Sequence, residues 1–336
     1  MLKERINSKI NNNTYLVNMP FPIKNLLIEV TNACNNKCIF CYNHCMKRKR
    51  KFIDEKLCKK VLNEAYKLGM REVGFYVTGE PLLDDRLDYF ILYAKNIGYE
   101  YIYITTNGIL ANLDRVKKLY DSGLNSIKYS INAINSSDYI FIHNTDNFNK
   151  VIFNLESVYD WKIKNNIDLK IFVSYIATKK TCEIDKVKSF FKNKCDEVVI
   201  MSAVNQGGLM PSINKYLSCN TNEINNKFSL PCNYPFNSVI VTCEGYLTAC
   251  CMDFENLLTY ADLNKVSLKD AWNNFIITEL RKKHINKDVS NTICENCIYN
   301  STKKPVPMCD NLTEFDLESF SFCNHLEKKI DGDLKK

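Results

Sequence analysis

Apolar and polar residues follow two different periods along this chain. Short apolar runs rich in β-branched and aromatic residues predict strands at 26–30, 73–77, 101–105, 126–131, 169–176 and 197–201. Between them apolar residues recur at helical spacing, as in the segments 54–68 and 87–97. Gly69 and Gly98 follow these two segments, and glycine favours the left-handed conformation that ends a helix. The alternation predicts βαβ units around a parallel sheet.

The pattern changes after residue 201. A polar, Asn-rich stretch runs to Ser229, and a strand-like run at 238–242 and a helix near 267–284 follow it. A chain of 336 residues is long enough for one large domain and a smaller one. We expect an N-terminal extension at 1–24, an α/β domain at 25–210, a linker at 211–229, a small domain at 230–310 and a charged tail at 311–336.

A cysteine-rich loop follows the first predicted strand. Cys34, Cys38 and Cys41 have the spacing C-x3-C-x2-C. A [4Fe–4S] cluster normally takes four cysteine ligands, so three thiolates on one loop can hold three irons and leave the fourth open. The alternative is a zinc site completed by Cys45 or His44, because Zn²⁺ accepts sulfur and nitrogen ligands at similar spacing.

The loop resembles the signature of the radical SAM superfamily. The resemblance implies that the amino and carboxylate groups of S-adenosylmethionine (SAM) chelate the open iron, and that Phe40 packs against the cluster or the adenine. It also implies an α/β fold, a partial (βα)6 TIM-like barrel with its ligands at the C-terminal strand ends. We predict this barrel, followed by a small C-terminal auxiliary-cluster domain.

Further motifs stand at the ends of predicted strands. Thr78-Gly79-Glu80-Pro81 resembles the family's Gly-Gly-Glu-Pro element, which binds the methionine ammonium of SAM, but a threonine replaces the first glycine. Ser130 and Asn132 resemble a Ser-x-Asn pair that bonds the ribose and carboxylate of SAM. Ordinary turns and strand-end polar groups are the alternatives. The predicted SAM-binding residues are Phe40, Thr78, Gly79, Glu80, Thr106, Asn107, Ser130, Asn132 and, in the loop after the sixth strand, Val204.

The C-terminal region carries a second set of cysteines. Cys232-x17-Cys250, closed by the C-x2-C of Cys294 and Cys297, resembles the auxiliary-cluster domain called SPASM, or twitch when shortened. Four ligands suit one auxiliary [4Fe–4S] cluster without an open iron, while a structural zinc held by the same thiols is the alternative. Cys251 is adjacent to Cys250, and the Gly-x4-Cys spacing selects Cys250 as the ligand.

The other cysteines receive no firm role. Sixteen cysteines without an export signal indicate a reducing, cytoplasmic compartment, where thiols serve metals rather than disulfides. We predict that Cys58, Cys182 and Cys195 pack in the interior, that Cys309 and Cys323 are bystanders, and that Cys243 is a doubtful ligand.

Charge and hydropathy exclude several classes of protein. The net charge of +7 is dispersed, apart from the basic run 47–51, which is either a solvated loop or a docking patch for an acidic reductant or substrate. No apolar run approaches the roughly 18 residues that span a bilayer. Aromatic residues do not alternate with basic ones as in a nucleic-acid groove. We expect neither a membrane nor a nucleic acid as partner.

The resemblance implies reductive cleavage of SAM to methionine and a 5′-deoxyadenosyl radical, which removes hydrogen from a substrate carbon. An external one-electron reductant such as flavodoxin or ferredoxin is then required. The shortened auxiliary domain resembles that of dehydrogenases that oxidise an aminocyclitol alcohol. We therefore predict oxidation of a small sugar- or cyclitol-like molecule, with the auxiliary cluster accepting an electron.

Two other functions stay open. One is a ribosomal-peptide maturase that crosslinks or epimerises, for which Cys219, Cys309 and Cys323 are spare hydrogen donors. The segment 1–24 is too short for the peptide-binding winged-helix domain of many maturases, which favours a small substrate. The other is a non-catalytic Fe–S or zinc binding module. No catalytic acid, base or hydrogen donor is assigned.

Overall fold

The computed structural model describes residues 4–5, 14–21, 25–213, 217, 229–314, 320 and 322–323. In this part of the chain one sheet has the strand order β6-β5-β4-β3-β2-β1-β7-β8-β9. Its strands are β1 (Asn25–Ile28), β2 (Glu72–Gly74), β3 (Tyr101–Thr106), β4 (Ser126–Ser130), β5 (Lys170–Ala177), β6 (Glu197–Ser202), β7 (Ser238–Val241), β8 (Tyr246–Thr248) and β9 (Thr259–Asp262).

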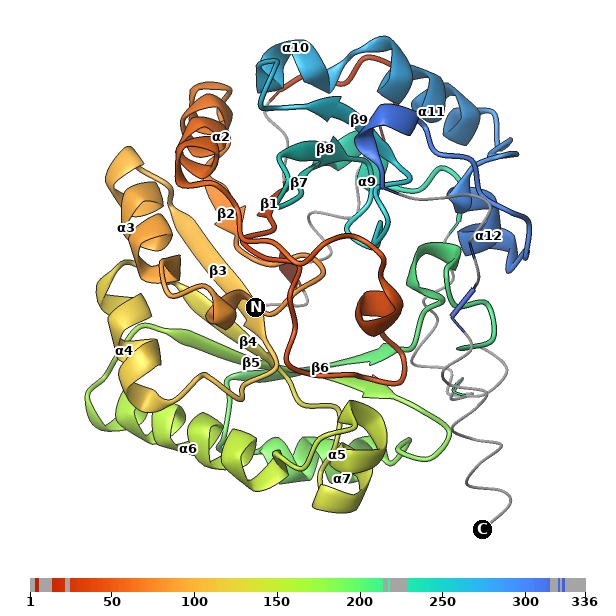
Figure 1. Ribbon diagram of the computed structural model, residues 1–336. Helices are drawn as coiled ribbons and strands as arrows, with labels where there is room; N and C mark the ends of the chain where they lie inside the picture. Colours follow the sequence, from red (N-terminus) through yellow and green to blue (C-terminus); the bar gives the residue numbers. More distant parts are fainter. Residues whose placement is uncertain are drawn as a thin grey trace.

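The first six strands are parallel and form the predicted partial barrel. Helices cover the outer face of the curved sheet (Figure 1). They are α2 (Glu55–Lys67), α3 (Leu87–Ile97), α4 (Leu113–Asp121), α5 (Ser136–His143), α6 (Phe148–Lys164) and α7 (Ile184–Phe191), with 3-10 turns η1 (Tyr42–Cys45), η2 (Pro81–Leu83) and η3 (Gln206–Gly208). The predicted alternation is confirmed, although β2 is shorter than the expected run 73–77.

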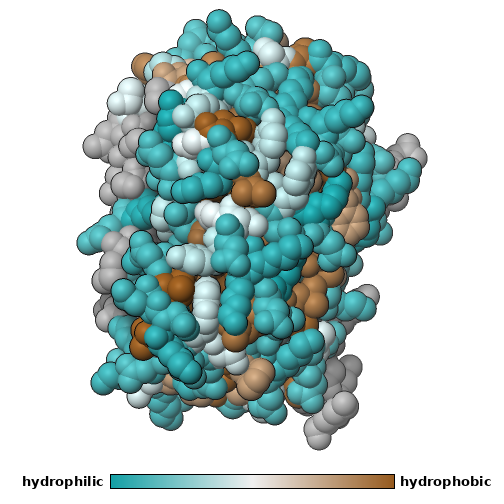
Figure 2. All heavy atoms as spheres, turned by 90° about the vertical axis from the view of Figure 1, so that its left-hand side faces the viewer, coloured by the Kyte–Doolittle hydropathy of each residue, from teal (hydrophilic) through white to brown (hydrophobic). Residues whose placement is uncertain are grey.

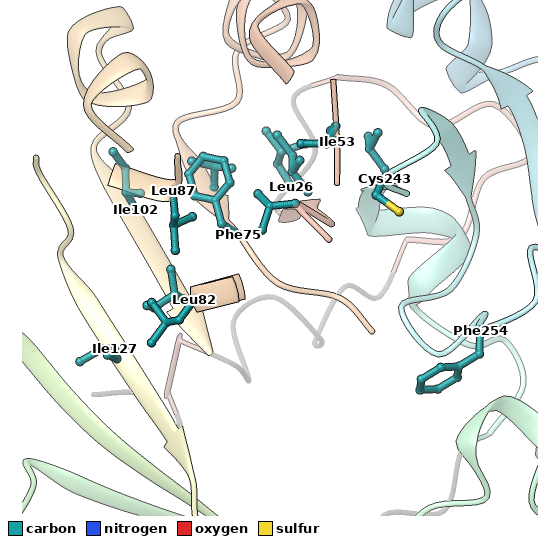
Figure 3. Packing of buried hydrophobic residues seen from close by; sticks show 14 of the residues in the cluster. Leu26, Ile53, Phe75, Leu82, Leu87, Ile102, Ile127, Cys243 and Phe254 are labelled. Carbon is teal, nitrogen blue, oxygen red and sulfur yellow. The ribbon is translucent and has the colours of Figure 1, made fainter. Parts of the chain in front are cut away.

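Helix α2 illustrates how the sequence determines these elements. The Asp54 side chain accepts a hydrogen bond from the Leu57 amide and caps the first turn. The apolar stripe of α2 is buried against the sheet, where Leu57 and Val61 join a hydrophobic cluster that includes Leu26 and Phe75 (Figure 3). Burial of such side chains contributes about 1.5–3 kcal/mol each, so this stripe holds the helix on the barrel.

The C-terminal region continues the barrel sheet instead of forming a separate sheet. Strand β7 pairs in parallel with β1, with Asn25 opposite Ser238 and Ile28 opposite Val241. Strands β8 and β9 extend it antiparallel. Here the described helices are α9 (Tyr234–Asn237), α10 (Leu268–Trp272), α11 (Phe275–Ile285) and α12 (Ile293–Tyr299), with the 3-10 turn η4 (Asp310–Leu312). The pairing fixes the small domain beside the start of the cysteine loop.

The helix predicted at 267–284 is in fact two helices. Asn274 has extended backbone and its side chain accepts a hydrogen bond from the Ile277 amide, so α11 starts anew after α10. The break lets Trp272 donate a hydrogen bond to the Met19 carbonyl at 2.9 Å. The N-terminal segment 14–21 is thereby bound to the small domain.

Polar residues dominate the face on which the outer barrel helices lie, with scattered apolar ones among them (Figure 2). Within the described residues, no helix has the length and apolar character needed to cross a membrane.

Candidate metal and cofactor site

The loop with Cys34, Cys38 and Cys41 lies between the barrel and the small domain (Figure 1). It leaves the C-terminal end of β1, and backbone hydrogen bonds within the loop and to α5 fix it. The Ile39 amide donates to the Ile142 carbonyl at 2.8 Å, and the Cys41 amide donates to the Cys38 carbonyl at 3.0 Å. The three thiols are therefore held on one short, ordered segment.

Burial raises the pKa of each of the three thiols, that of Cys41 to about 12. A thiol in such surroundings stays protonated unless a metal replaces the proton. Three thiols of this kind on one loop suit metal ligation.

A histidine that the sequence did not single out touches this loop. His143 of α5 places Nδ1 3.1 Å from Cys38 Sγ and Nε2 2.6 Å from the Ile131 carbonyl oxygen. Burial lowers the pKa of His143 to about 4, so the ring is neutral. Its Nε2 donates to the carbonyl and its Nδ1 is an acceptor beside Cys38. More than a hundred residues separate the two side chains, so no local motif could reveal the contact.

Gly79 lies against the backbone of the cysteine loop. A Cβ atom there would stand 2.2 Å from the Thr31 carbonyl oxygen and 2.6 Å from that of Ala33, distances at which the backbone would have to move. The next amide, of Glu80, donates to the Ala33 carbonyl at 2.8 Å. We predicted that Gly79 contacts SAM. In the structure, the missing side chain makes room for the backbone of the cysteine loop.

The Glu80 carboxylate lies at the end of β3. It accepts hydrogen bonds from Thr106 Oγ1 and from the Asn107 amide, both at 2.7 Å, and from the Leu82 amide at 3.1 Å. Burial raises its pKa to about 7 despite these donors. A cationic ligand group would favour the charged form. This placement suits the predicted ammonium-binding role, which stays a prediction.

The other predicted SAM-binding residues surround the same strand ends. Asn107 Nδ2 donates to Asn35 Oδ1 at 2.6 Å and lies 4.0 Å from Cys34 Sγ. Ser130 pairs with Ser174 of β5 at 3.1 Å, and the Asn132 oxygen accepts from the Ile176 amide at 2.8 Å. Phe40 is buried in the hydrophobic cluster, and Val204 lies in the loop after β6.

In the basic run 47–51 only Arg48 is buried, whereas the other four residues are exposed. Arg48 is 3% exposed and binds Glu29 of the β1 end and Glu244 of the β7–β8 turn, at 2.6 Å each. Burial alone would raise the pKa of Glu29, but Arg48 and Thr78 lower it below the usual value. Arg50 is also engaged, with the Asn32 and Asn43 carbonyls. Arg48 is therefore a buried structural residue, and for the exposed residues of the run the solvated loop and the docking patch both stay predictions.

This ion-pair network also explains the threonine that replaces a family glycine. Thr78 donates a hydrogen bond through Oγ1 to Glu29, and its amide lies 3.3 Å from the same carboxylate. The Cys243 amide donates to the other Glu29 oxygen at 3.0 Å. Cys243 is thus buried beside Arg48, away from the predicted auxiliary ligands.

Cys232, Cys250, Cys294 and Cys297 line one cavity in the small domain, with apolar neighbours such as Leu258 and Ile293. Cys294 and Cys297 lie one turn apart on α12, so both thiols face the same side. The pKa of each of the four thiols is raised. The fold therefore brings together the four side chains chosen from spacing.

His284 lines the same cavity and supplies a test of what it holds. Its Nδ1 accepts a hydrogen bond from the Cys232 amide at 3.2 Å, so Nε2 carries the proton. Nε2 is buried and has no partner among the described residues. An acceptor such as a cluster sulfide would satisfy it, so four thiols and one N–H donor fit an iron–sulfur cluster.

Cys251 is hydrogen-bonded to its neighbour Cys250. It is also hydrogen-bonded to Tyr234 and interacts electrostatically with Tyr76 and Lys128 of the barrel interior. Cys250 alone of this pair lines the thiol cavity. The choice of Cys250 as the ligand, made from the glycine spacing, stays a prediction.

The expectation of free thiols elsewhere needs correction. Cys45 forms a disulfide with Cys323, and Cys182 is also disulfide-bonded. In this disulfide Cys45 is not a free thiol that could complete a zinc site with Cys34, Cys38 and Cys41. Cys323, which we predicted to have no role, is its disulfide partner. Cys58 and Cys195 are buried as predicted. Cys309 donates to Asn311 at 2.9 Å, and Cys219 lies outside the described residues.

Comparison with known proteins identifies both regions. A family model described as the radical SAM superfamily matches residues 28–178, and one described as an iron–sulfur cluster-binding SPASM domain matches residues 232–298. The chain belongs to the radical SAM superfamily. Its two domains imply a SAM-binding [4Fe–4S] cluster, SAM and auxiliary iron–sulfur ligation. The three-thiol loop and the four-thiol cavity fit these groups.

Two curated relatives illustrate the range of the superfamily. A probable GTP 3′,8-cyclase of Saccharolobus solfataricus is 32% identical over 139 residues, 41% of this chain and 44% of the relative. The chain thus spans less than half of that cyclase. The S-adenosyl-L-methionine-dependent 2-deoxy-scyllo-inosamine dehydrogenase of Niallia circulans is 24% identical over 279 residues, which cover 80% of this chain and 90% of the relative.

Solved structures support the fold. BtrN in complex with AdoMet and 2-DOIA is 20% identical with a TM-score of 0.55, covering 88% of this chain and 99% of that one. Streptococcus suis SuiB bound to precursor peptide SuiA is 15% identical with a TM-score of 0.63, covering 89% and 77%. At these identities the likeness concerns the partial barrel and its C-terminal domain, and it confirms the predicted fold class.

Proposed function

We propose that the protein is a radical SAM oxidoreductase that removes two electrons and two hydrogens from a small sugar- or cyclitol-like alcohol. The observation that carries this proposal is the presence of two thiol sites on one sheet, three thiols at the end of β1 and four in the small domain. A cluster held by the first set would leave one iron for SAM, whereas a cluster held by the second set would have a protein ligand on every iron. A relative that oxidises 2-deoxy-scyllo-inosamine covers most of the chain.

When bound, the cofactors would supply an adenosyl radical that takes a hydrogen atom and an iron–sulfur acceptor for the remaining electron. The protein residues have other tasks. Glu80 is proposed to hold the SAM ammonium, with Thr106 and Asn107 fixing its carboxylate. Because Gly79 has no side chain, the backbone of the cysteine loop can lie directly against the segment that carries Glu80.

The barrel interior is proposed to hold the substrate between the two sites. Tyr76 lies there beside Tyr103, with ring centroids 6.0 Å apart. Tyr234 and Cys251 enter from the small domain, and their interactions with Tyr76 bring the two domains together at this point. A substrate in this space would contact residues of both domains.

The test is anaerobic reconstitution, SAM turnover with an external reductant, and mass analysis of the product. A dehydrogenase of this kind yields one 5′-deoxyadenosine for each product molecule. The product is two mass units lighter than the substrate. In D₂O, a product of unchanged oxidation level with one deuterium at the reacting carbon would instead establish epimerisation and overturn the proposal. A modified peptide as product would establish a maturase.

A further inference from the structure

A lysine inside the barrel takes no part in either thiol site. Lys128 is the middle residue of β4 and lies between Thr105 of β3 and Phe172 of β5 in the strand register. Its neighbours Ile127 and Tyr129 are buried in the hydrophobic cluster beneath the outer helices. Because side chains alternate along a strand, Lys128 projects into the barrel interior.

Aromatic and thiol groups, rather than carboxylates, surround the Lys128 ammonium. Nζ lies 5.7 Å from the centroid of the Tyr76 ring. Cys251, from the small domain, is near enough to interact with it electrostatically. Within the described part of the chain, Lys128 forms no ion pair with a carboxylate. No carboxylate of the described residues therefore neutralises the Lys128 ammonium, and the acidic group that faces it is the Cys251 thiol.

The carboxylates of Glu72 and Glu80 have partners other than Lys128. Glu72, at the opposite end of the barrel, is paired with Arg5 at 2.5 Å, and the Arg5 guanidinium lies 3.4 Å from the Tyr101 ring centroid. Glu80 is bonded to Thr106 and to the Asn107 amide. Glu197 of β6 lies two strands from Lys128 in the same register row, across Phe172, and within the described residues no carboxylate forms an ion pair with Lys128.

An unpaired lysine in such a place is unfavourable for folding. Transfer of an ammonium from water to a poorly solvated site costs free energy unless an anion or several acceptors replace the water. Burial accordingly lowers the pKa of Lys128. An apolar side chain would fill the same space without this cost. A bound anion would offset this unfavourable free energy, because it would supply a negative charge beside Lys128. The lysine is half-buried and its backbone is fixed in β4.

Lys128 lies between the predicted SAM-binding residues and the thiols of the small domain, and this position indicates that the anion belongs to the substrate. Ser130, a predicted SAM contact, follows two residues later on the same face of β4, and Thr105 precedes the Glu80 partner Thr106. Cys251, on the other side, adjoins the auxiliary ligand Cys250. A molecule that touches Lys128 therefore lies in the space assigned to the substrate.

We propose that Lys128 binds an anionic group of the substrate, a carboxylate or a phosphate, so that the protein acts on acidic sugars or sugar phosphates and rejects amino-substituted cyclitols. This rests on the proposed oxidation of a small polar molecule, and it narrows the substrate class. An amino group would be repelled by the Lys128 charge, whereas an acidic oxygen would make a charge-assisted hydrogen bond.

The experiment measures binding, without turnover, to the reconstituted protein carrying clusters and SAM. The probes are D-glucose, D-glucuronate, glucose 6-phosphate and D-glucosamine, titrated calorimetrically at constant ionic strength. We expect at least one acidic probe to bind about tenfold or more tightly than glucose, and glucosamine to bind more weakly. The two acidic probes distinguish a carboxylate from a phosphate.

Variants assign the preference to Lys128. Lys128→Gln should lower the affinity for the preferred acidic probe about 10- to 100-fold and leave glucose binding unchanged, while Lys128→Arg should keep the preference. Lys170→Gln, at an exposed position of β5, is the matched control. Iron content and melting temperature are compared first, so that a misfolded variant is not scored.

The proposal is wrong if no acidic probe binds more tightly than glucose, or if the preference survives in Lys128→Gln. Because binding is measured without turnover, this outcome is separate from the mass test of oxidation. An acidic preference that depends on Lys128, together with a product of unchanged oxidation level, would leave the role of Lys128 standing and overturn the oxidation.

Discussion

The two thiol sites of this molecule are assembled in different ways. Cys34, Cys38 and Cys41 lie within one loop whose backbone is fixed by neighbouring amides and carbonyls. The four thiols of the small domain come from three separated segments, around Cys232, around Cys250 and on α12. The first site is a local structure that the barrel supports, whereas the second exists only once the tertiary fold has formed. Cysteine substitutions at the two sites should therefore have different effects on the protein.

The largest effect is expected from the local site. Replacing Cys34, Cys38 and Cys41 together by alanine should abolish SAM cleavage and lower the iron content from about eight to about four per chain. The fold should persist, because these thiols make few contacts other than those with His143 and Asn107. Iron and sulfide counting and a 5′-deoxyadenosine assay check this. Cys58→Ala, at a buried thiol away from both sites, is the control.

Tightly bound zinc without sulfide in anaerobically prepared wild-type protein would contradict this prediction. It would favour the zinc alternative at one or both thiol sites.

The distributed site should fail differently. Cys294→Ser with Cys297→Ser should leave SAM cleavage intact but stop formation of oxidised product, because the substrate radical then lacks its electron acceptor. The ratio of 5′-deoxyadenosine to product measures this uncoupling. Cys309→Ser, at a thiol outside the cavity, should keep the two in step. Equal loss of both compounds in the double variant would refute a role limited to the second electron.

The difference between a local site and one assembled from distant segments also determines how much could be predicted from the sequence. The barrel strands and the cysteine loop follow from local patterns, since periodicity and spacing are properties of neighbouring residues. The β1–β7 pairing and the contact between His143 and Cys38 could not be predicted, because each joins residues more than a hundred positions apart. The burial of Arg48 could not be predicted either, because only the fold brings Glu29 and Glu244 together around it.

Arg48 connects the two regions and should be the most sensitive position outside the thiols. Arg48→Met leaves the Glu29 carboxylate buried without its main counter-charge, which should destabilise the protein by about 3–5 kcal/mol. Denaturant titration under anaerobic conditions, with separate probes for each domain, measures the loss. Lys49→Met is the matched control, because Lys49 is exposed. Unchanged unfolding midpoints in Arg48→Met would mean that the ion pairs do not hold the domains together.

A smaller and more local effect is expected at Glu80. Glu80→Gln keeps the size of the side chain but removes its charge, so SAM affinity should fall about 10- to 100-fold while the iron content stays unchanged. Equilibrium binding of SAM to the reconstituted protein tests this. Glu55→Gln, at the exposed start of α2, should bind SAM as the wild type does. If Glu80→Gln binds SAM normally, the carboxylate serves only to hold Thr106 and Asn107.

The smallest effect separates a structural role of Thr78 from a cofactor role. Thr78→Val preserves shape but removes the hydroxyl that donates to Glu29. The loss should cost about 1.5 kcal/mol of stability, near the lower end for a bond to a charged group, because Arg48 and the Cys243 amide still serve the carboxylate. Thr78→Ser keeps the hydroxyl and should restore most of the stability. SAM affinity should be the same in both variants, since the hydroxyl faces Glu29. A fall in SAM affinity without a change in the unfolding midpoint would instead assign Thr78 to the cofactor, and the threonine would then belong to the local site rather than to the network that connects it with the small domain.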